Sequence, residues 1–265
     1  MADDPPPLIT LLTDFGVGSP YVAQMKGVIL GLNPQANVID VTHAIPPQDI
    51  SQGAWALLDV AESFPLGSIH VAVVDPGVGG ARQVVYAEIA ERHYIAPDNG
   101  LLSRLAVRAT PSRIVALTEP RFWRASVSAT FHGRDIMAPV AAHLSLGLEP
   151  DQLGPRLAEL RQLPRAEVNI LANRIEGSIR SIDSFGNLVT DVTAEALQGV
   201  PTDERATIVC DEHETQGIFR TYEDQPAMTL MALVGSSGFL ELAIVGDSAA
   251  LMLGVRVGTP VTIKW

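Results

Sequence analysis

Three short segments of the sequence carry side chains that could take part in catalysis. Asp14 follows an apolar run in TDFG, Asp75 opens the glycine-rich segment DPGVGGAR that ends at Arg82, and His132 lies in TFHGRD. A carboxylate at the end of a strand can accept two hydrogen bonds from a vicinal diol, and glycines let the backbone approach a ligand closely. A histidine at the start of a helix is favoured in its neutral form, because the helix N-terminus disfavours positive charge.

Each of these segments also has a purely structural explanation. Asp14 could cap the helix that follows near Ser19, Asp75 could pair with Arg82, and His132 could be a capping or packing residue. A buried Asp–Arg pair stabilises a fold poorly, but it keeps the carboxylate ionised. The glycine-rich segment is not a Walker loop or GxGxxG, and the chain has no HExxH, no paired cysteines and no GxSxG. Metal binding and serine nucleophile chemistry are therefore not expected.

Two further candidate segments lie in the last third of the chain. Asp183, Phe185 and Asn187 fall within five positions and could line an adenine or ribose site, although the same residues are typical of a hairpin turn. The segment GSSGFLE at 235–241 also has the composition of a turn, with Phe239 in the core.

The elements that must position these residues change in type along the chain. Up to about residue 160, short apolar runs alternate with segments of helical periodicity, which predicts a mostly parallel sheet covered on both faces. Strands are expected at 8–13, 38–42, 68–74, 84–89 and 93–96, and helices at 21–32, at 51–64 with Ser51 as its cap, at 100–107 and at 134–146. Ligands of such sheets bind at the carboxyl ends of the strands, where the loops of Asp14 and Asp75 begin.

From residue 166 onward the sequence consists mainly of short β-like runs with glycine turns. One short amphipathic stretch, 194–198, is the only helical material expected there. This pattern predicts a small β barrel or sandwich. We therefore expect an α/β fold with an N-terminal α/β domain over 1–165 and a smaller C-terminal all-β domain over 166–265.

The composition of the chain limits which binding partners and which cellular compartment are expected. The 265 residues include 18 basic and 30 acidic side chains, for a net charge of −12. This acidic balance argues against nucleic acid or an anionic membrane surface as the main partner. A single cysteine, Cys210, rules out an internal disulfide framework and fits a reducing compartment. With no targeting segment at its start and no membrane span expected, we expect a cytoplasmic protein.

Taken in order, the motifs resemble those of the S-adenosyl-L-methionine (SAM) hydrolases, also called SAM hydroxide adenosyltransferases, which are related to the SAM-dependent fluorinases and chlorinases. The resemblance extends over nearly the whole chain, through TDFG, VAQMKGVI, DVTH, VVDPGVGG, APDNGLL, TFHGRD, FGN and SSGFLELA. It implies an N-terminal α/β domain and a C-terminal β domain. It also implies a homotrimer whose active sites lie between the N-terminal domain of one subunit and the C-terminal domain of the next.

The resemblance also implies roles for single residues. Asp75, Arg82 and His132 match the catalytic set of the hydrolases, and Asp14 matches the carboxylate that binds the ribose diol. The methionine and adenine pocket would be formed by Asp183, Phe185, Asn187, Ser236, Phe239, Glu241 and Ile244.

Five positions bear on the branch of the family and on the details of the pocket. Halogenases carry Tyr at position 75 and Tyr-Ser at 132–133, so Gly133 lacks the hydroxyl that binds halide, and a hydrolase is expected. Gly235 stands where relatives usually have Asn, and Gln48 where halogenases have an aromatic residue. These two departures concern the adenine and ribose pocket and leave the reaction class unchanged.

The implied reaction converts SAM and water to adenosine and L-methionine, with no cofactor and no metal. The sulfonium departs as a neutral thioether, so the site must mainly hold a water in line with C5′ and assist the loss of its proton. Either Asp75 or His132 could take that proton. The alternatives are a halide adenosyltransferase, a non-catalytic SAM or adenosine binding module and, more remotely, a metal-dependent phosphohydrolase.

Overall fold

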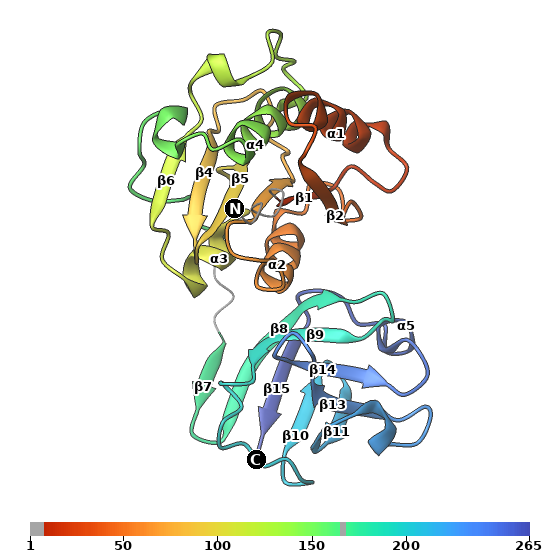
Figure 1. Ribbon diagram of the computed structural model, residues 1–265. Helices are drawn as coiled ribbons and strands as arrows, with labels where there is room; N and C mark the ends of the chain where they lie inside the picture. The colour runs from red at the N-terminus through yellow and green to blue at the C-terminus, as the bar shows by residue number, and fades with distance from the viewer. Residues whose placement is uncertain (1–7, 165–167) are drawn as a thin grey trace, which may run out of the picture. The chain divides into compact units, whose positions relative to one another are not determined.

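The computed structural model describes residues 8–164 and 168–265. The chain divides into two compact units, residues 1–163 and 164–265 (Figure 1). The boundary expected between residues 165 and 166 falls on residues outside the described part. No helix among the described residues is long and apolar enough to cross a membrane.

The N-terminal unit contains a six-stranded sheet with the strand order β2-β1-β3-β5-β4-β6. Parallel pairing joins β1 to β2, β1 to β3 and β3 to β5, whereas β4 is antiparallel to both its neighbours. The predicted mostly parallel sheet is thus confirmed, and β6 is an additional strand. The bounds are β1 (Leu8–Thr13), β2 (Asn37–Thr42), β3 (Ile69–Val73), β4 (Val84–Ile89), β5 (Arg92–Pro97) and β6 (Arg113–Ala116).

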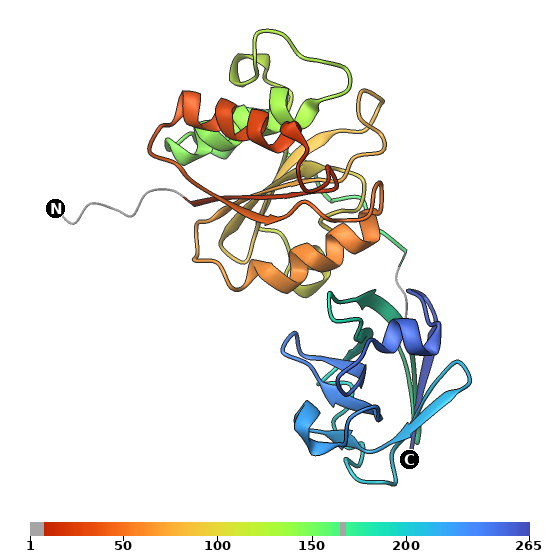
Figure 2. The same ribbon diagram turned by 90° about the vertical axis from the view of Figure 1, so that its right-hand side faces the viewer.

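Helices cover both faces of this sheet. α1 (Pro20–Leu32) and α4 (Ala138–Ser145) lie on one face, and α2 (Ile50–Ala61) and α3 (Ser103–Arg108) on the other (Figure 2). The side-chain period of two along each strand explains the two cores. Ile9 and Leu11 of β1 belong to the cluster with α1 and α4, and Leu12 belongs to the cluster with α2 and α3.

Three helix starts differ from those expected. The α3 helix begins at Ser103 rather than at Gly100, which lies in a turn with φ +104°. The α2 helix is capped by Asp49, whose side chain accepts a hydrogen bond of 2.9 Å from the backbone N–H of Gln52, so the assignment of Ser51 as the cap is wrong. The helix expected from residue 134 begins instead with a π-helical turn, Gly133–Met137. Pro139 has no N–H to donate to the carbonyl of Asp135, which accepts from the backbone N–H of Arg124 at 2.9 Å instead.

The C-terminal unit is a strongly curved nine-stranded sheet. Its order is β11-β10-β15-β8-β9-β14-β13-β12, with β7 paired to β8. The two outermost strands follow each other in the chain, separated only by Gly217 at φ +80°, and the Thr215 hydroxyl of β11 donates to the carbonyl of Leu230 in β13 at 2.8 Å. The edges therefore meet, and the sheet is nearly a barrel. The bounds are β7 (Asn169–Leu171), β8 (Arg174–Ile182), β9 (Leu188–Thr193), β10 (Thr207–Cys210), β11 (His213–Gln216), β12 (Ile218–Phe219), β13 (Leu230–Val234), β14 (Phe239–Ile244) and β15 (Pro260–Lys264).

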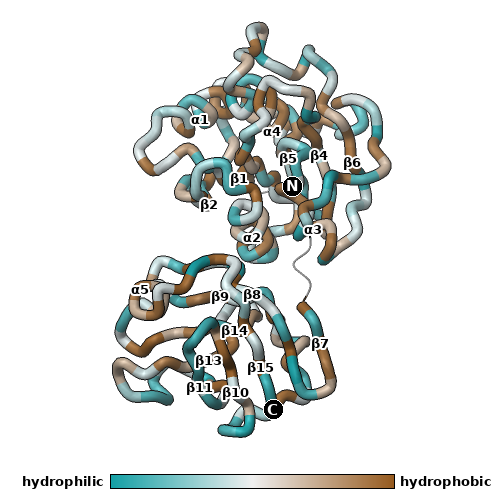
Figure 3. Tube along the Cα trace, turned by 180° about the vertical axis from the view of Figure 1, so that it is seen from behind, coloured by the Kyte–Doolittle hydropathy of each residue, from teal (hydrophilic) through white to brown (hydrophobic). Residues whose placement is uncertain are grey.

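The predicted strand-rich character of this unit is confirmed. Strands such as β13 and β14 consist largely of hydrophobic residues (Figure 3). The stretch 194–198 forms turns rather than a helix, because Gly199 at φ +90° and Pro201 end it at once. A short helix, α5 (Ala249–Leu253), begins instead at Ser248, whose hydroxyl accepts from the N–H of Leu251.

Candidate active site

A cleft of about 280 Å³ opens at the carboxyl ends of β1 and β3. Asp14 directly follows β1, and Asp75 follows β3 by two residues. Parallel neighbours end at the same edge of the sheet, so both loops meet there, as the sequence predicts. The cleft is lined by Asp14, Phe15, Gln48, Val73, Asp75, Pro76, Val78, Thr130, Phe131, His132 and Gly133.

Asp75 and Arg82 form a nearly buried pair at this cleft. Arg82 Nε donates to both carboxylate oxygens of Asp75 at 3.0 Å, and Arg82 Nη2 donates to Oδ2. Only 5% of the Asp75 side chain and 8% of the Arg82 side chain are exposed. This fork-like contact fixes the guanidinium plane and leaves a further N–H direction of Nη2 for another acceptor.

His132 supplies that acceptor. Arg82 Nη2 lies 2.9 Å from His132 Nδ1, and a guanidinium can only donate, so Nδ1 must present its lone pair. The neutral ring then carries its proton on Nε2. Burial and the positive charge of Arg82 both lower the pKa of His132, which keeps this neutral form at neutral pH. Nε2–H is therefore the remaining polar group of a ring that lines the cleft.

The segment that carries His132 is held by the fully buried carboxylate of Asp135. That carboxylate accepts from Arg134 Nε at 2.7 Å, from the Ser128 N–H at 2.8 Å and from Arg124 Nη1 at 2.9 Å. Burial opposes its ionisation, but these hydrogen bonds outweigh that effect and hold the pKa of Asp135 at about 2. Asp135 therefore stays ionised and anchors the 124–135 segment.

A glycine brings the Asp75 loop against this segment. Gly79 has φ +77°, and a Cβ at this position would lie 2.3 Å from the carbonyl oxygen of Ala129. Only glycine permits both the backbone conformation and the contact. The close approach explains how Asp75 and His132, which are 57 positions apart, come to share one arginine.

Asp14 lies on another wall of the cleft. Its Oδ2 accepts a hydrogen bond of 2.8 Å from the backbone N–H of Gln48. Gln48 adopts a left-handed backbone conformation with φ +66°, which is uncommon for a residue other than glycine. The structure thus brings three of the predicted site residues, Asp14, Asp75 and His132, to the wall of one cleft, together with Gln48. Arg82 contacts both Asp75 and His132 there.

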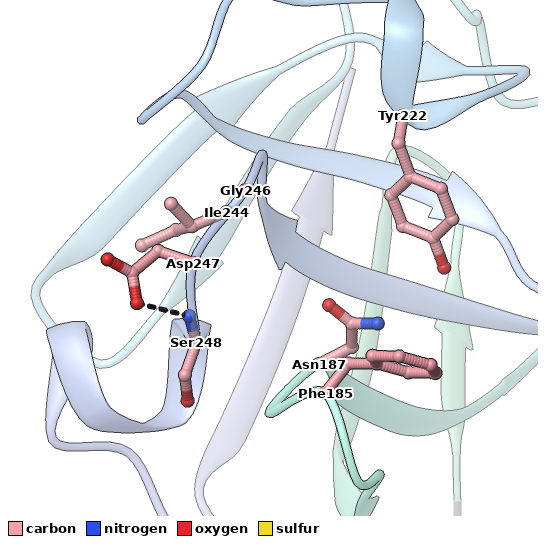
Figure 4. A pocket seen from close by; sticks show the side chains of 7 residues that line it. All are labelled: Phe185, Asn187, Tyr222, Ile244, Gly246, Asp247 and Ser248. Atoms are coloured by element: carbon pink, nitrogen blue, oxygen red, sulfur yellow. Dashed lines mark hydrogen bonds between the residues drawn. The ribbon is translucent and has the colours of Figure 1, made fainter.

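A second pocket, of about 520 Å³, lies in the C-terminal unit (Figure 4). Its lining includes Phe185, Asn187 and Ile244 from the expected set, together with Tyr222, Gly246, Asp247 and Ser248. Asp183 shapes its rim. Oδ1 of Asp183 accepts from the N–H groups of Phe185 and Asn187 at 2.9 Å, and Oδ2 accepts from the side-chain amide of Asn187 at 3.0 Å.

Glu241 lies behind this pocket and holds Tyr222. The phenol donates to Glu241 Oε1 at 2.5 Å, and only 6% of Glu241 is exposed. The pKa of Glu241 is raised overall. Burial raises it most, the charge of Asp183 adds to this effect, and the hydrogen bond from Tyr222 only partly offsets them. A Cβ at Gly235 would lie 2.6 Å from Glu241 Oε2, so the glycine at this position leaves room for the carboxylate.

The other two expected residues lie away from the pocket lining. Phe239 is buried in the core, where the guanidinium of Arg180 stacks 4.0 Å from its ring centre. Ser236 lies in the turn between β13 and β14. Neither is among the described residues that line this pocket. The described residues also contain no group of three or more His, Cys, Asp or Glu side chains placed to hold a metal ion.

Comparison with known proteins gives the family. The model of the SAM hydroxide adenosyltransferase N-terminal domain matches residues 9–154, and that of the corresponding C-terminal domain matches residues 177–262. The chain belongs to the SAM hydroxide adenosyltransferase family. The predicted resemblance is thereby confirmed.

Individual members of this family and its relatives agree with the assignment. The chain is 38% identical to the (R)-S-adenosyl-L-methionine hydrolase of Thermus thermophilus, an alignment that covers 96% of this chain and 98% of the relative. A fluorinase of Nocardia brasiliensis is 27% identical, with 97% of each chain covered. The crystal structure of an uncharacterized conserved protein from Thermotoga maritima superposes with a TM-score of 0.93 at 31% identity, covering 97% of this chain and 100% of that one.

Several lining residues were not singled out from the sequence. Phe15, Thr130 and Phe131 lie inside the motifs TDFG and TFHGRD, so their position beside Asp14 and His132 was a usable signal. Tyr222 offered no such signal, because it begins a short 3-10 helix and its partner Glu241 lies 19 positions away in β14.

Proposed function

We propose that this protein hydrolyses SAM to adenosine and L-methionine by attack of water on C5′. The observation that carries the proposal is the Asp75–Arg82–His132 cluster at the wall of the Asp14 cleft, in a chain 38% identical to an (R)-S-adenosyl-L-methionine hydrolase. No cofactor takes part in this reaction. The sulfonium is already an activated leaving group, because the C5′–S electron pair ends on a neutral thioether.

The three residues have separate tasks in this proposal. His132 donates Nε2–H to the oxygen of the attacking water and holds it in line with C5′ and sulfur. The guanidinium of Arg82 stabilises the negative charge that develops on that oxygen. Asp75 accepts the proton, because its oxygens retain lone pairs beyond those used by Arg82, whereas Nδ1 of His132 accepts from Arg82 and Nε2 already carries a proton.

Substrate binding divides between the two described pockets. Asp14 accepts hydrogen bonds from the ribose diol in the N-terminal cleft. Phe185, Asn187 and Ile244 offer an apolar surface and an amide to the adenine. Glu241 and Asp183 attract the cationic methionine portion of SAM, with Ser236 and Phe239 in support.

We further propose a homotrimer in which the N-terminal cleft of one subunit and the C-terminal pocket of the next form one active site. The division of polar groups between the two units supports this arrangement, since one carries the groups for attack on C5′ and the other carries the aromatic pocket. The free, buried thiol of Cys210 is consistent with work in a reducing, cytoplasmic compartment.

Halide transfer is the second candidate, since fluorinases are among the more distant relatives. Gly133 disfavours it, because glycine has no hydroxyl to bind halide. A Cβ there would lie 3.4 Å from both Met25 Sδ and Val73 Cγ1, which is an ordinary contact.

The test is to incubate the purified protein with SAM and identify the products by mass spectrometry, with and without chloride, and with and without a chelator. We expect adenosine and methionine in equal amounts under all four conditions. Intact SAM would support a binding module, and 5′-chloroadenosine that forms only with chloride would support a transferase. Activity lost to the chelator would indicate a metal-dependent enzyme.

A further inference from the structure

We infer that residues 43–48 act as a clamp that presets the Asp14 carboxylate for substrate, with His43 and Gln48 as positioning residues. The inference rests on the proposed function, in which Asp14 binds the ribose diol. It concerns the motif DVTH and the departure at Gln48, neither of which has a role in the chemical step proposed above.

Gln48 holds the carboxylate through its backbone. Its N–H donates to Asp14 Oδ2 at 2.8 Å, and its φ of +66° aims that N–H at the carboxylate. An uncommon backbone conformation persists only where the surroundings impose it, and such residues cluster at functional sites. Here the imposed conformation joins a cleft residue to the carboxylate that faces the same cleft.

His43 holds the backbone on either side of Asp14. Its carbonyl oxygen accepts from the N–H of Gly16 at 2.8 Å, and its Nδ1 lies 2.9 Å from the Thr13 hydroxyl oxygen. That hydroxyl oxygen also accepts from the N–H of Phe15 at 3.2 Å. The residues before and after Asp14 are therefore tied to one histidine.

The imidazole of His43 is itself oriented from behind. Its Nε2 lies 3.0 Å from Asp40 Oδ1, and Lys26 Nζ donates to Asp40 Oδ2 at 2.6 Å. The imidazole therefore lies between Thr13 at Nδ1 and Asp40 at Nε2. The pKa of Asp40 is lowered, because hydrogen bonds and charges from Lys26 and His43 outweigh its burial. The chain Lys26–Asp40–His43–Thr13 thus fixes the ring plane.

Such a clamp reduces the ordering that substrate must impose on Asp14 when it binds. It touches neither Arg82 nor His132, and the segment of His132 is held separately by Asp135. Loss of the clamp should therefore raise KM for SAM and leave kcat nearly unchanged.

The first experiment compares Q48V with Q48G. Both remove the side-chain amide, but glycine accepts the left-handed conformation and a β-branched residue strongly resists it. We expect the KM of Q48V to be about tenfold higher than that of Q48G, with the kcat values of the two variants within about twofold of each other. Equal effects of the two substitutions, or no effect of Q48V, would overturn the backbone role.

The second experiment compares H43A with H43N. The side-chain amide of asparagine reaches roughly the place of Nδ1 and can keep the contact with Thr13, whereas alanine cannot. We expect H43A to raise KM about tenfold and H43N to recover most of that loss. A fall in kcat with KM unchanged would instead assign His43 to the chemical step and contradict a positioning role.

Amide hydrogen exchange separates failure of the clamp from failure of the proposed function, because it needs no substrate. The amides of Phe15 and Gly16 should be protected in the wild-type protein and exchange about tenfold faster in H43A, with the core strands unaffected. If the wild type does not hydrolyse SAM but these amides respond, the proposed function fails and the clamp stands. If the amides do not respond, the clamp fails whatever the activity.

Discussion

Arg82 joins Asp75 to His132, with its Nε 3.0 Å from each carboxylate oxygen and its Nη2 2.9 Å from the imidazole Nδ1. Since a guanidinium has no lone pair to offer, Nδ1 of His132 must accept from Arg82, and the neutral ring carries its proton on Nε2. The arrangement separates two tasks, the donation of a hydrogen bond to the nucleophile and the acceptance of its proton.

The planar guanidinium of Arg82, and not only its positive charge, should be essential for catalysis. Lysine at this position keeps the positive charge but cannot contact both carboxylate oxygens and the imidazole together. We expect R82K to lower kcat by about 10²-fold or more, with a smaller change in KM. The matched control is R205K, which changes an exposed pair with Asp203 and should leave the kinetics unchanged. R82K kinetics close to wild type would show that charge alone is sufficient.

The role of His132 as a donor can be separated from that of a base. We expect H132A to lower kcat by roughly 10²–10⁴-fold. H132Q should recover about tenfold of that loss, because a glutamine amide can donate from near the Nε2 position but cannot accept a proton. The lowered pKa of His132 also predicts that kcat persists as pH falls below 6.5, the ordinary histidine value. A glutamine variant no better than alanine would favour His132 as the base.

Tyr222 should tune the charge of Glu241. In Y222F the buried carboxylate loses its hydrogen bond, so its pKa should rise further and the free energy of unfolding should fall by about 1–3 kcal/mol. KM for SAM should rise, most at low pH. The double variant Y222F/E241Q should regain much of the stability, because no buried charge is left unpaired. Stability of the double variant that equals the sum of the two single losses would contradict a direct coupling.

Much of the fold follows from local pattern. The period of two along β1 and β3 and the helical spacing of α1 and α2 predict the layered N-terminal unit, and close turns predict the β-rich C-terminal one. Where the predicted helix start at residue 134 differed from the structure, a contact between residues distant in sequence was responsible. The backbone N–H of Arg124 donates to the Asp135 carbonyl, for which Pro139 has no N–H, and the expected α-helical start is a π-helical turn.

The candidate site was less accessible to local reasoning. Asp75 and Arg82 lie within eight positions, so their pairing could be predicted from spacing. The contact of His132 with the same guanidinium depends on the close approach of Gly79 to Ala129. The periodicity of the sequence does not predict such an approach. Tyr222 was missed for a similar reason, since it contacts Glu241 from 19 positions away and no local pattern relates the two.

The fully buried His70 predicts a pH dependence of stability. Burial, with smaller contributions from the charges of Arg92 and His93, lowers its pKa to about 4 from 6.5. Below pH 6.5 the unfolded chain binds a proton that the folded chain refuses until about pH 4, so the free energy of unfolding falls as pH falls through this window, by up to about 3 kcal/mol. Urea unfolding at pH 5 and 7 should show a smaller decrease for H70F. An equal decrease in both proteins would place the effect elsewhere.

The central claim is that water attacks C5′ of SAM, and isotope labelling tests it most directly. The wild-type protein is incubated with SAM in ¹⁸O water without halide, and the adenosine is analysed by tandem mass spectrometry. The account predicts one ¹⁸O atom in the 5′-hydroxyl of adenosine and none in methionine. Adenosine without ¹⁸O, or label found in any fragment other than the ribose, would contradict it.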